Sequence, residues 1–127
     1  MNVVDSSAWL SYFAGDTNSG NFARAIEDLD RLLVPTIALT EVFKSVLRQR
    51  GEEAALEVIA HMEQGQVVPL DAPLALEAAK TGVELRLPLA DSIIYATAKR
   101  FGATVWTQDS DFDGLDDVRY YAKPSAT

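Results

Sequence analysis

Cysteine is absent from this chain of 127 residues, and histidine occurs once, at His61. The lack of cysteine excludes disulfides, thiolate metal sites and cysteine nucleophiles. His61 falls in an expected helix far from the acidic residues considered below, so we expect it to be an ordinary surface or half-buried residue. Chemistry in this chain must therefore be sought among its other polar residues.

Long hydrophobic runs are also absent. No segment approaches the ~18 consecutive apolar residues of a membrane span, and Asp5 interrupts the N-terminus where a signal peptide would need an apolar stretch. Internal repeats and linkers rich in proline or glycine are lacking too. Because 48% of the residues are hydrophobic, a packed core is expected. The sequence predicts one soluble, cytoplasmic domain over residues 1–127.

Positive charge is scarce: 11 basic residues face 19 acidic ones, and the formal net charge is −8. A protein that grips nucleic acid with its whole surface usually carries the opposite sign. An acidic balance suits metal binding by carboxylates, a basic partner, or solubility alone. A nucleic-acid substrate would therefore have to be recognised by a local site.

The hydrophobic pattern predicts alternating strands and helices. Strands are expected at residues 1–5, 33–35, 66–70, 103–107 and 118–121, and helices at residues 6–13, 22–33, 36–50, 52–63, 73–85 and 91–101. Asp5, Ser6 and Thr36 stand where side chains cap helix N-termini. The order predicts an α/β fold with a mostly parallel sheet of about four or five short strands and helices on both faces.

Two acids follow strands in this pattern. Asp5 comes after Val3-Val4, and Asp109 comes after the strand that ends at Thr107. In open parallel sheets, sites lie beyond the carboxyl ends of the strands. Both acids are therefore candidates for a functional site, although an acidic turn would also explain Asp109.

Two further acids lie on expected helices. Glu41 is almost opposite the apolar stripe of helix 36–50, and periodicity alone favours a solvated surface glutamate. Asp91 opens a helix within an apolar neighbourhood, where the macrodipole alone would favour an acid. The stripe opposite Glu41 is formed by Leu39, Val42, Phe43, Val46 and Leu47.

The four carboxylates together predict more than each does alone. They can converge only in a parallel sheet, and close carboxylates repel one another and raise each other's pKa. A hard divalent cation such as Mg²⁺ removes that cost, because it prefers oxygen ligands and works beside phosphate. Such a cation can activate water and stabilise charge during phosphodiester hydrolysis.

Four segments in this order resemble the PIN-domain family of ribonucleases. They are Val3-Val4-Asp5-Ser6-Ser7-Ala8-Trp9-Leu10, Val34-Pro35-Thr36 leading into Leu39-Thr40-Glu41-Val42, the stretch from Leu87 to Ala98 around Asp91, and Thr107-Gln108-Asp109-Ser110-Asp111-Phe112. The resemblance spans nearly the whole chain. It implies a PIN fold over residues 1–127 and endonucleolytic cleavage of RNA that depends on Mg²⁺, with Mn²⁺ as a substitute.

The same resemblance implies roles for individual residues. Asp5, Glu41, Asp91 and Asp109 become the metal-binding and water-activating set. Ser6 and Thr107 become auxiliary hydroxyls that orient waters or neighbouring acids, and Asp111 is either an auxiliary acid or a turn former.

The small size of the chain resembles, more narrowly, the VapC-type toxins of VapBC toxin–antitoxin pairs. This resemblance implies inhibition by a small VapB-like antitoxin, often through a basic residue, and a homodimer. Complementary charge would steer a basic peptide to an acidic pocket. Trp9, Tyr12 and Phe13 could serve a dimer interface, but core packing explains them equally well.

Basic residues that could hold RNA are few. Lys44 and Arg48, on the face of Glu41, are the best candidates for phosphate contacts, although a salt-bridged helix face would explain them as well. Arg86, Lys99 and Arg100 fit a solvated surface better. The sequence does not distinguish transfer, ribosomal and messenger RNA as the substrate.

Other classes of protein fit less well. A phospho-acceptor receiver domain needs an acidic pair after the first strand and a late lysine, and a haloacid-type phosphatase needs D-x-D there; Asp5-Ser6-Ser7 provides neither. The remaining alternative is a catalytically silent PIN module that acts as a partner-binding regulatory subunit.

Overall fold

The computed structural model describes residues 1–125. Five strands and six helices follow one another, with two short 3₁₀ helices between them. Their bounds are β1 Asn2–Val4, α1 Ser6–Ala14, α2 Ser19–Ile26, η1 Leu29–Arg31, β2 Leu32–Pro35, α3 Thr36–Arg50, α4 Glu52–Met62, β3 Gln66–Val68, α5 Ala72–Leu85, α6 Leu89–Arg100, β4 Thr104–Thr107, η2 Ser110–Phe112 and β5 Val118–Tyr120.

The strands form one parallel sheet in the order β3-β2-β1-β4-β5. Strand β1 is central, with Val3 opposite Leu33 of β2 and Val105 of β4. From β1 the chain runs outward to β2 and β3, then crosses back to β4 on the other side. The strand order therefore reverses between β1 and β4, where α/β sheets usually place ligand sites. The predicted α/β fold with a parallel sheet is confirmed.

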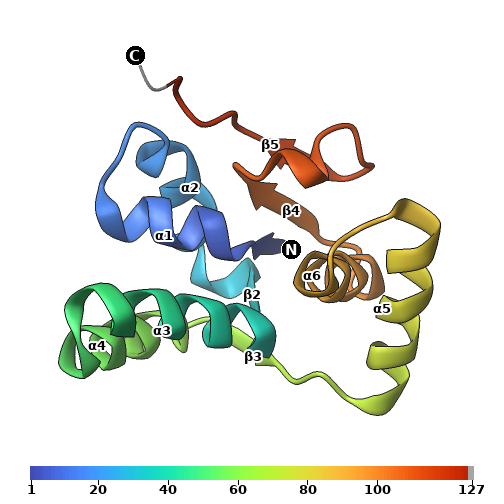
Figure 1. Ribbon diagram of the computed structural model, residues 1–127, viewed down its shortest axis with the longest axis horizontal. Coiled ribbons are helices and arrows are strands. Elements are labelled where there is room, and N and C mark those ends of the chain that lie inside the picture. Colours follow the sequence, from blue (N-terminus) through green and yellow to red (C-terminus); the bar gives the residue numbers. More distant parts are fainter. Residues whose placement is uncertain (126–127) are drawn as a thin grey trace.

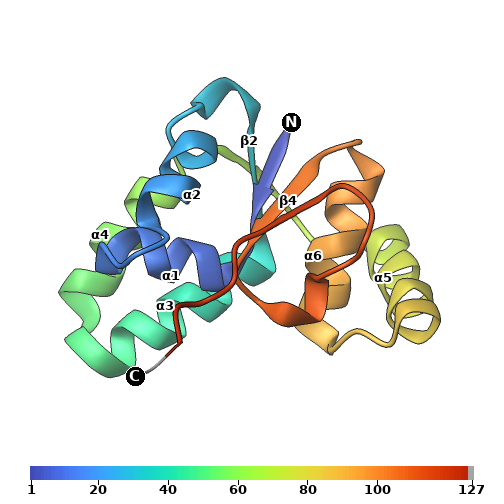
Figure 2. The same ribbon diagram turned by 90° about the horizontal axis from the view of Figure 1, so that it is seen from above.

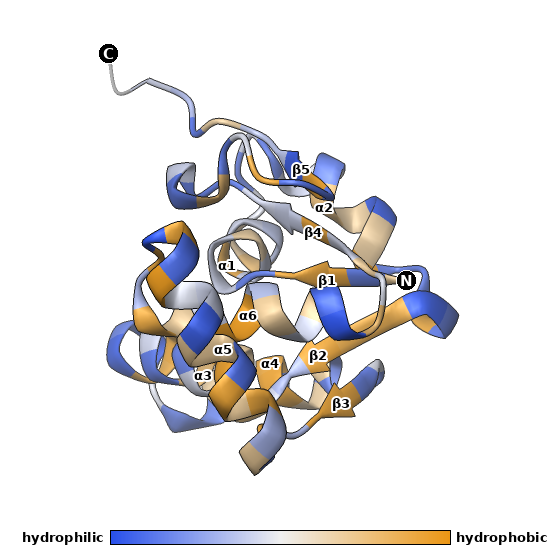
Figure 3. Ribbon diagram, turned by 90° about the vertical axis from the view of Figure 1, so that its right-hand side faces the viewer, coloured by the Kyte–Doolittle hydropathy of each residue, from blue (hydrophilic) through white to orange (hydrophobic). Residues whose placement is uncertain are grey.

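Helices cover both faces of the sheet (Figures 1 and 2). Helices α1 to α4 pack on one face, around Trp9, Phe22, Val42 and Trp106. Helix α6 packs on the other face against Val3, and α5 lies outside α6. Hydropathy follows these layers, because the buried strand β2 is hydrophobic whereas α5 alternates between hydrophilic and hydrophobic residues (Figure 3). No helix within residues 1–125 is both long and apolar enough to cross a membrane.

Two local predictions are wrong. The helix expected at residues 22–33 ends at Ile26, and Leu32 belongs to β2, where it is fully buried beside Leu33 of the expected strand at residues 33–35. A short apolar run in a strand buried on both faces cannot be distinguished from a helix end by periodicity. Thr36 does not cap α3 but is its first residue, because Pro35 holds the preceding extended conformation.

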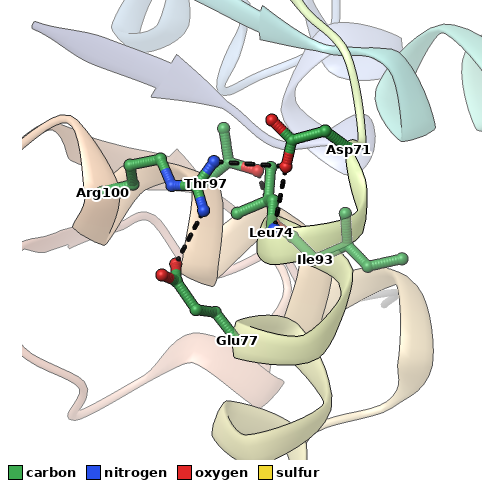
Figure 4. Close-up of polar contacts among 6 residues, drawn as sticks. All are labelled: Asp71, Leu74, Glu77, Ile93, Thr97 and Arg100. Atoms are coloured by element: carbon green, nitrogen blue, oxygen red, sulfur yellow. Dashed lines mark hydrogen bonds and ion pairs between the residues drawn. The ribbon is translucent and has the colours of Figure 1, made fainter.

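Ion pairs connect helix α5 to α6. At the end of α6, the Arg100 guanidinium places Nη1 3.4 Å from Asp71 Oδ1 and Nη2 3.3 Å from Glu77 Oε2 (Figure 4). Asp71 also caps α5, accepting a 2.9 Å hydrogen bond from the Leu74 N–H. Lys99 forms a separate 3.2 Å ion pair with Asp117. Arg100 and Lys99 thus pair with carboxylates on the surface, as expected for the solvated surface positions that the sequence predicts for them.

Candidate active site

Asp5 lies directly after β1 and is 2% exposed. It caps α1: its Oδ1 accepts hydrogen bonds from the Ala8 N–H at 3.1 Å and from the Ser7 hydroxyl at 2.8 Å. Its own N–H donates to the carbonyl of Trp106 in β4. These bonds hold the carboxylate at the switch point between β1 and β4.

Asp109 and Asp111 follow β4 at the same edge of the sheet. The Asp109 N–H donates to the Thr107 hydroxyl at 2.9 Å. The Asp109 side chain in turn caps η2, accepting from the Asp111 N–H at 2.9 Å. This turn directs two carboxylates toward one region, and Thr107 orients the loop that carries them.

Asp91, in the first turn of α6, completes a group of three acids. One carboxylate oxygen from each of Asp91, Asp109 and Asp111 lies within 4.8 Å of the others. Asp111 is therefore beside the acids rather than on an isolated turn. The three side chains come from two sequence-distant segments that only the folded sheet and α6 bring together.

Burial and mutual repulsion raise the pKa of two of these acids. Burial is the main reason that the pKa of Asp5 is raised to about 6, against hydrogen bonds from Ser7, Ala8 and Thr107 that lower it. The pKa of Asp91 is raised to about 7, first by desolvation and then by the charge of Asp109 and a hydrogen bond with Asp111. Asp5 adds to the repulsion on Asp91, so the four aspartates form one electrostatic unit.

Glu41 is attached to this unit through Ser6. It is half-buried on α3, and its Oε1 accepts a 2.6 Å hydrogen bond from the Ser6 hydroxyl. Ser6 is the neighbour of Asp5, so α1 and α3 meet at the site. Periodicity favoured a solvated glutamate, and the Ser6 contact instead ties Glu41 to the residue that follows Asp5.

The other residues singled out from the sequence lie elsewhere. Lys44 and Arg48 are exposed on α3, and Arg86 is exposed at the end of α5. His61 is half-buried against the rings of Tyr12 and Phe13. Trp9 is fully buried, and Tyr12 and Phe13 are partly buried against the same core.

Three polar residues beside the acids were missed from the sequence. The Ser7 hydroxyl binds Asp5, and Gln108 reaches Ser7 through two 3.4 Å hydrogen bonds from its backbone and side-chain nitrogens. Asn18, only 7% exposed, donates to the Gln108 side chain at 3.1 Å. No sequence pattern marks Asn18, because its partner is 90 residues away.

Two hollows flank Gln108. The first, of about 330 Å³, runs between α1 and α3 and is lined by Ser7, Gln49, Arg50, Gln108 and Lys123 among others. The second, of about 240 Å³, is lined by Gln108, Asp109, Ser110, Tyr120, Ala122 and Lys123. Of the acids of the site, Asp109 lines the second hollow, so this hollow reaches the edge of the acidic cluster.

The residues present fit a hard divalent cation. Three carboxylates with oxygens within 4.8 Å of one another supply the oxygen ligands that such ions prefer. The raised pKa values of Asp5 and Asp91 show that negative charge is disfavoured here without a counter-charge. No cysteine or histidine competes for a softer metal at this point.

The fold and site are those of a small parallel α/β protein with an acidic centre at the switch point of its sheet. The chain belongs to the PIN domain family, which it matches over residues 3–118.

Solved structures share this fold. A toxin–antitoxin complex from Klebsiella pneumoniae is 20% identical, with a TM-score of 0.80, covering 97% of this chain and 100% of that one. VapC20 of Mycobacterium tuberculosis, described as a toxin that cleaves the sarcin–ricin loop, is 22% identical, with a TM-score of 0.76 and coverage of 93% and 97%. DNA-bound VapBC from Salmonella typhimurium is 16% identical, with a TM-score of 0.73 and coverage of 95% and 96%. The comparison with curated proteins gave no match.

Proposed function

We propose that the protein is an endoribonuclease that hydrolyses RNA phosphodiester bonds and depends on Mg²⁺, with Mn²⁺ as a substitute. The observation that carries this proposal is the meeting of Asp91, Asp109 and Asp111 beside the buried Asp5 at the switch point of a PIN-domain sheet. Phosphodiester hydrolysis by this route needs only carboxylates, a metal ion and water.

The chain's own residues have distinct tasks in this proposal. Asp5, Glu41, Asp91 and Asp109 would hold the cation, with Asp111 as an auxiliary ligand. When bound, the ion activates water and stabilises charge on the phosphate oxygens. The Ser6 hydroxyl fixes Glu41, and Thr107 and Ser7 fix the loop of Asp109 and the carboxylate of Asp5. Asp5, Glu41 and Asp109 are thus oriented by hydroxyls that the fold positions before substrate arrives.

We further propose that the protein acts in the cytoplasm as the toxin of a type II toxin–antitoxin pair. Support comes from the similar structures, which include a toxin–antitoxin complex and a toxin that cleaves the sarcin–ricin loop. A VapB-like antitoxin would bring a basic residue to the acidic site, where charge complementarity favours it. A homodimer, and phosphate contacts by Lys44 and Arg48, remain predictions of the same hypothesis.

The decisive experiment measures RNA cleavage by purified protein that has been freed of any partner. Reactions contain Mg²⁺, Mn²⁺ or EDTA, and compare wild type with Asp5→Asn, Asp91→Asn and the control Asp30→Asn, an exposed acid outside the site. We expect cleavage only with metal, a loss of at least about 100-fold in both site variants, and no change in the control. Activity that survives in both site variants would refute the assigned site. Absence of cleavage across transfer, ribosomal and messenger RNA would favour the silent partner-binding module.

A further inference from the structure

The C-terminal segment after β5 lies against the candidate site. Figure 2 shows this segment running past β4 toward α1. Along this path Lys123 lines both hollows that flank Gln108, including the one that contains Asp109. Lys123 therefore borders both hollows, and one of them contains Asp109.

Asn18 anchors this segment at the site. Its side-chain nitrogen donates to the carbonyl of Tyr121 at 3.3 Å and to that of Ala122 at 3.1 Å, in addition to Gln108. The Tyr121 ring packs on Trp106 and Phe22. The buried Asn18 amide thus contacts the Gln108 side-chain oxygen and the carbonyls of Tyr121 and Ala122, the two residues that precede Lys123.

Charge gives Lys123 a specific task. A polyanion that approaches a cluster of carboxylates is repelled unless local cations compensate. Among the described residues, the ion pairs employ Lys99 and Arg100, and Lys123 is in none of them. Lys44, one of the two candidates named from the sequence, borders a different hollow that is lined mainly by apolar residues, and the other, Arg48, lines neither hollow beside Gln108.

We propose that Lys123, held in place by Asn18, binds a phosphate of the RNA strand that enters the site. This inference rests on the proposed ribonuclease function. It identifies Lys123 as a substrate-binding residue and Asn18 as a positioning residue that acts through the backbone of Tyr121 and Ala122. Arg50 also lines the first hollow, but in the hollow that contains Asp109 the only lysine or arginine among the lining residues is Lys123.

The test measures binding separately from cleavage. The Asp91→Asn protein is titrated with Mg²⁺ present against a short fluorescein-labelled single-stranded RNA of mixed sequence, and anisotropy gives Kd at several salt concentrations. Adding Lys123→Gln should weaken binding roughly three- to tenfold and reduce the salt slope by about 0.7, the loss of one phosphate contact. Lys80→Gln, the same change on an exposed residue of α5, should do neither.

Coupling tests the role assigned to Asn18. Asn18→Ala should weaken binding to a similar degree, and combining it with Lys123→Gln should add little, because both act on one contact. Additive effects would overturn the role of Asn18, provided that circular dichroism shows the variants to be folded. An unchanged Kd and salt slope in Lys123→Gln would overturn the proposal while leaving the ribonuclease function intact. Failure of the Asp91→Asn protein to bind RNA that wild type cleaves would overturn the role of Lys123 and leave the ribonuclease function intact, because the contact would then hold no RNA by itself.

Discussion

At the scale of single residues, the site is a compromise between burial and charge. Asp5 stabilises the fold as the cap of α1, yet it is almost completely removed from water. Asp91 faces the charge of Asp109 and Asp111 from the start of α6. In both residues the protonated form is therefore favoured more than in an ordinary aspartate, and a bound cation would remove this preference by neutralising the cluster.

This compromise predicts an unusual pH dependence of stability for the metal-free protein. The unfolded chain releases these protons near pH 3.8, whereas the folded chain retains them up to about 6 at Asp5 and about 7 at Asp91. Over that interval the folded state holds more protons, so the free energy of unfolding falls as pH rises. Thermal melts in EDTA should give a lower Tm at pH 8 than at pH 5, and Mg²⁺ should raise Tm more at pH 8.

Variants of the two acids test whether they cause this pH dependence of Tm. Asp5→Asn and Asp91→Asn should each reduce the difference in Tm between pH 5 and pH 8, and Asp30→Asn should preserve it. A difference in Tm that persists unchanged when Asp5 and Asp91 are both replaced by Asn would show that other groups cause it.

At the scale of elements, the sequence predicts most of the helices and strands because their periodicity reports burial. Expected and observed bounds of α4 and β4 differ by only one residue. Prediction fails where burial gives no period. Strand β2 is buried on both faces of the sheet, so the sequence predicts Leu32 as part of the preceding helix and does not decide between helix and strand for Leu33. Glu41 was ambiguous for the related reason that its partner Ser6 lies on another helix.

The contact between α5 and α6 depends on one glycine. A Cβ added at Gly82 would lie 2.6 Å from the Ser92 Oγ and 3.3 Å from the Ser92 Cβ. Ser92 follows Asp91 and donates to the Pro88 carbonyl at 2.8 Å. We expect Gly82→Ala to lower the free energy of unfolding by about 1–3 kcal/mol through overpacking, and to reduce cleavage because the start of α6 must shift.

Urea unfolding compares this variant with Gly20→Ala in α2, where an added Cβ meets nothing within 4 Å. The control should be unchanged or more stable by up to ~1 kcal/mol. Equal stability of the two variants would contradict the close contact between Gly82 and Ser92.

At the scale of the whole molecule, strand order creates the site. Asp5 and Asp109 were predictable as acids after strands, but their adjacency requires β4 to pair with β1, which periodicity does not reveal. The same is true of Asn18, Gln108 and the C-terminal segment, whose contacts span 90 to 104 residues of sequence. Local pattern thus identifies candidate ligands, and topology decides which of them lie together.

The net charge of −8 makes a final prediction about RNA affinity. Without divalent ions, the ionised acids repel RNA, so wild type in EDTA at pH 8 should bind duplexes weakly and without sequence preference. Replacing Asp5 and Asp91 together by Asn removes two negative charges from the site where we propose that RNA binds. This double variant should bind roughly three- to tenfold more tightly than wild type in EDTA, with the gain shrinking as salt rises.

Fluorescence anisotropy with one labelled duplex measures all the proteins. Replacing Asp30 and Glu53, two exposed acids outside the site, by Asn and Gln gives the same net charge as the double variant. If repulsion acts locally, this control should gain much less affinity, because charges more than a Debye length from the strand are screened. An equal gain in both double variants would assign the repulsion to total charge. Tight binding of unrelated duplexes by wild type in EDTA would show that another surface, independent of metal, holds the RNA.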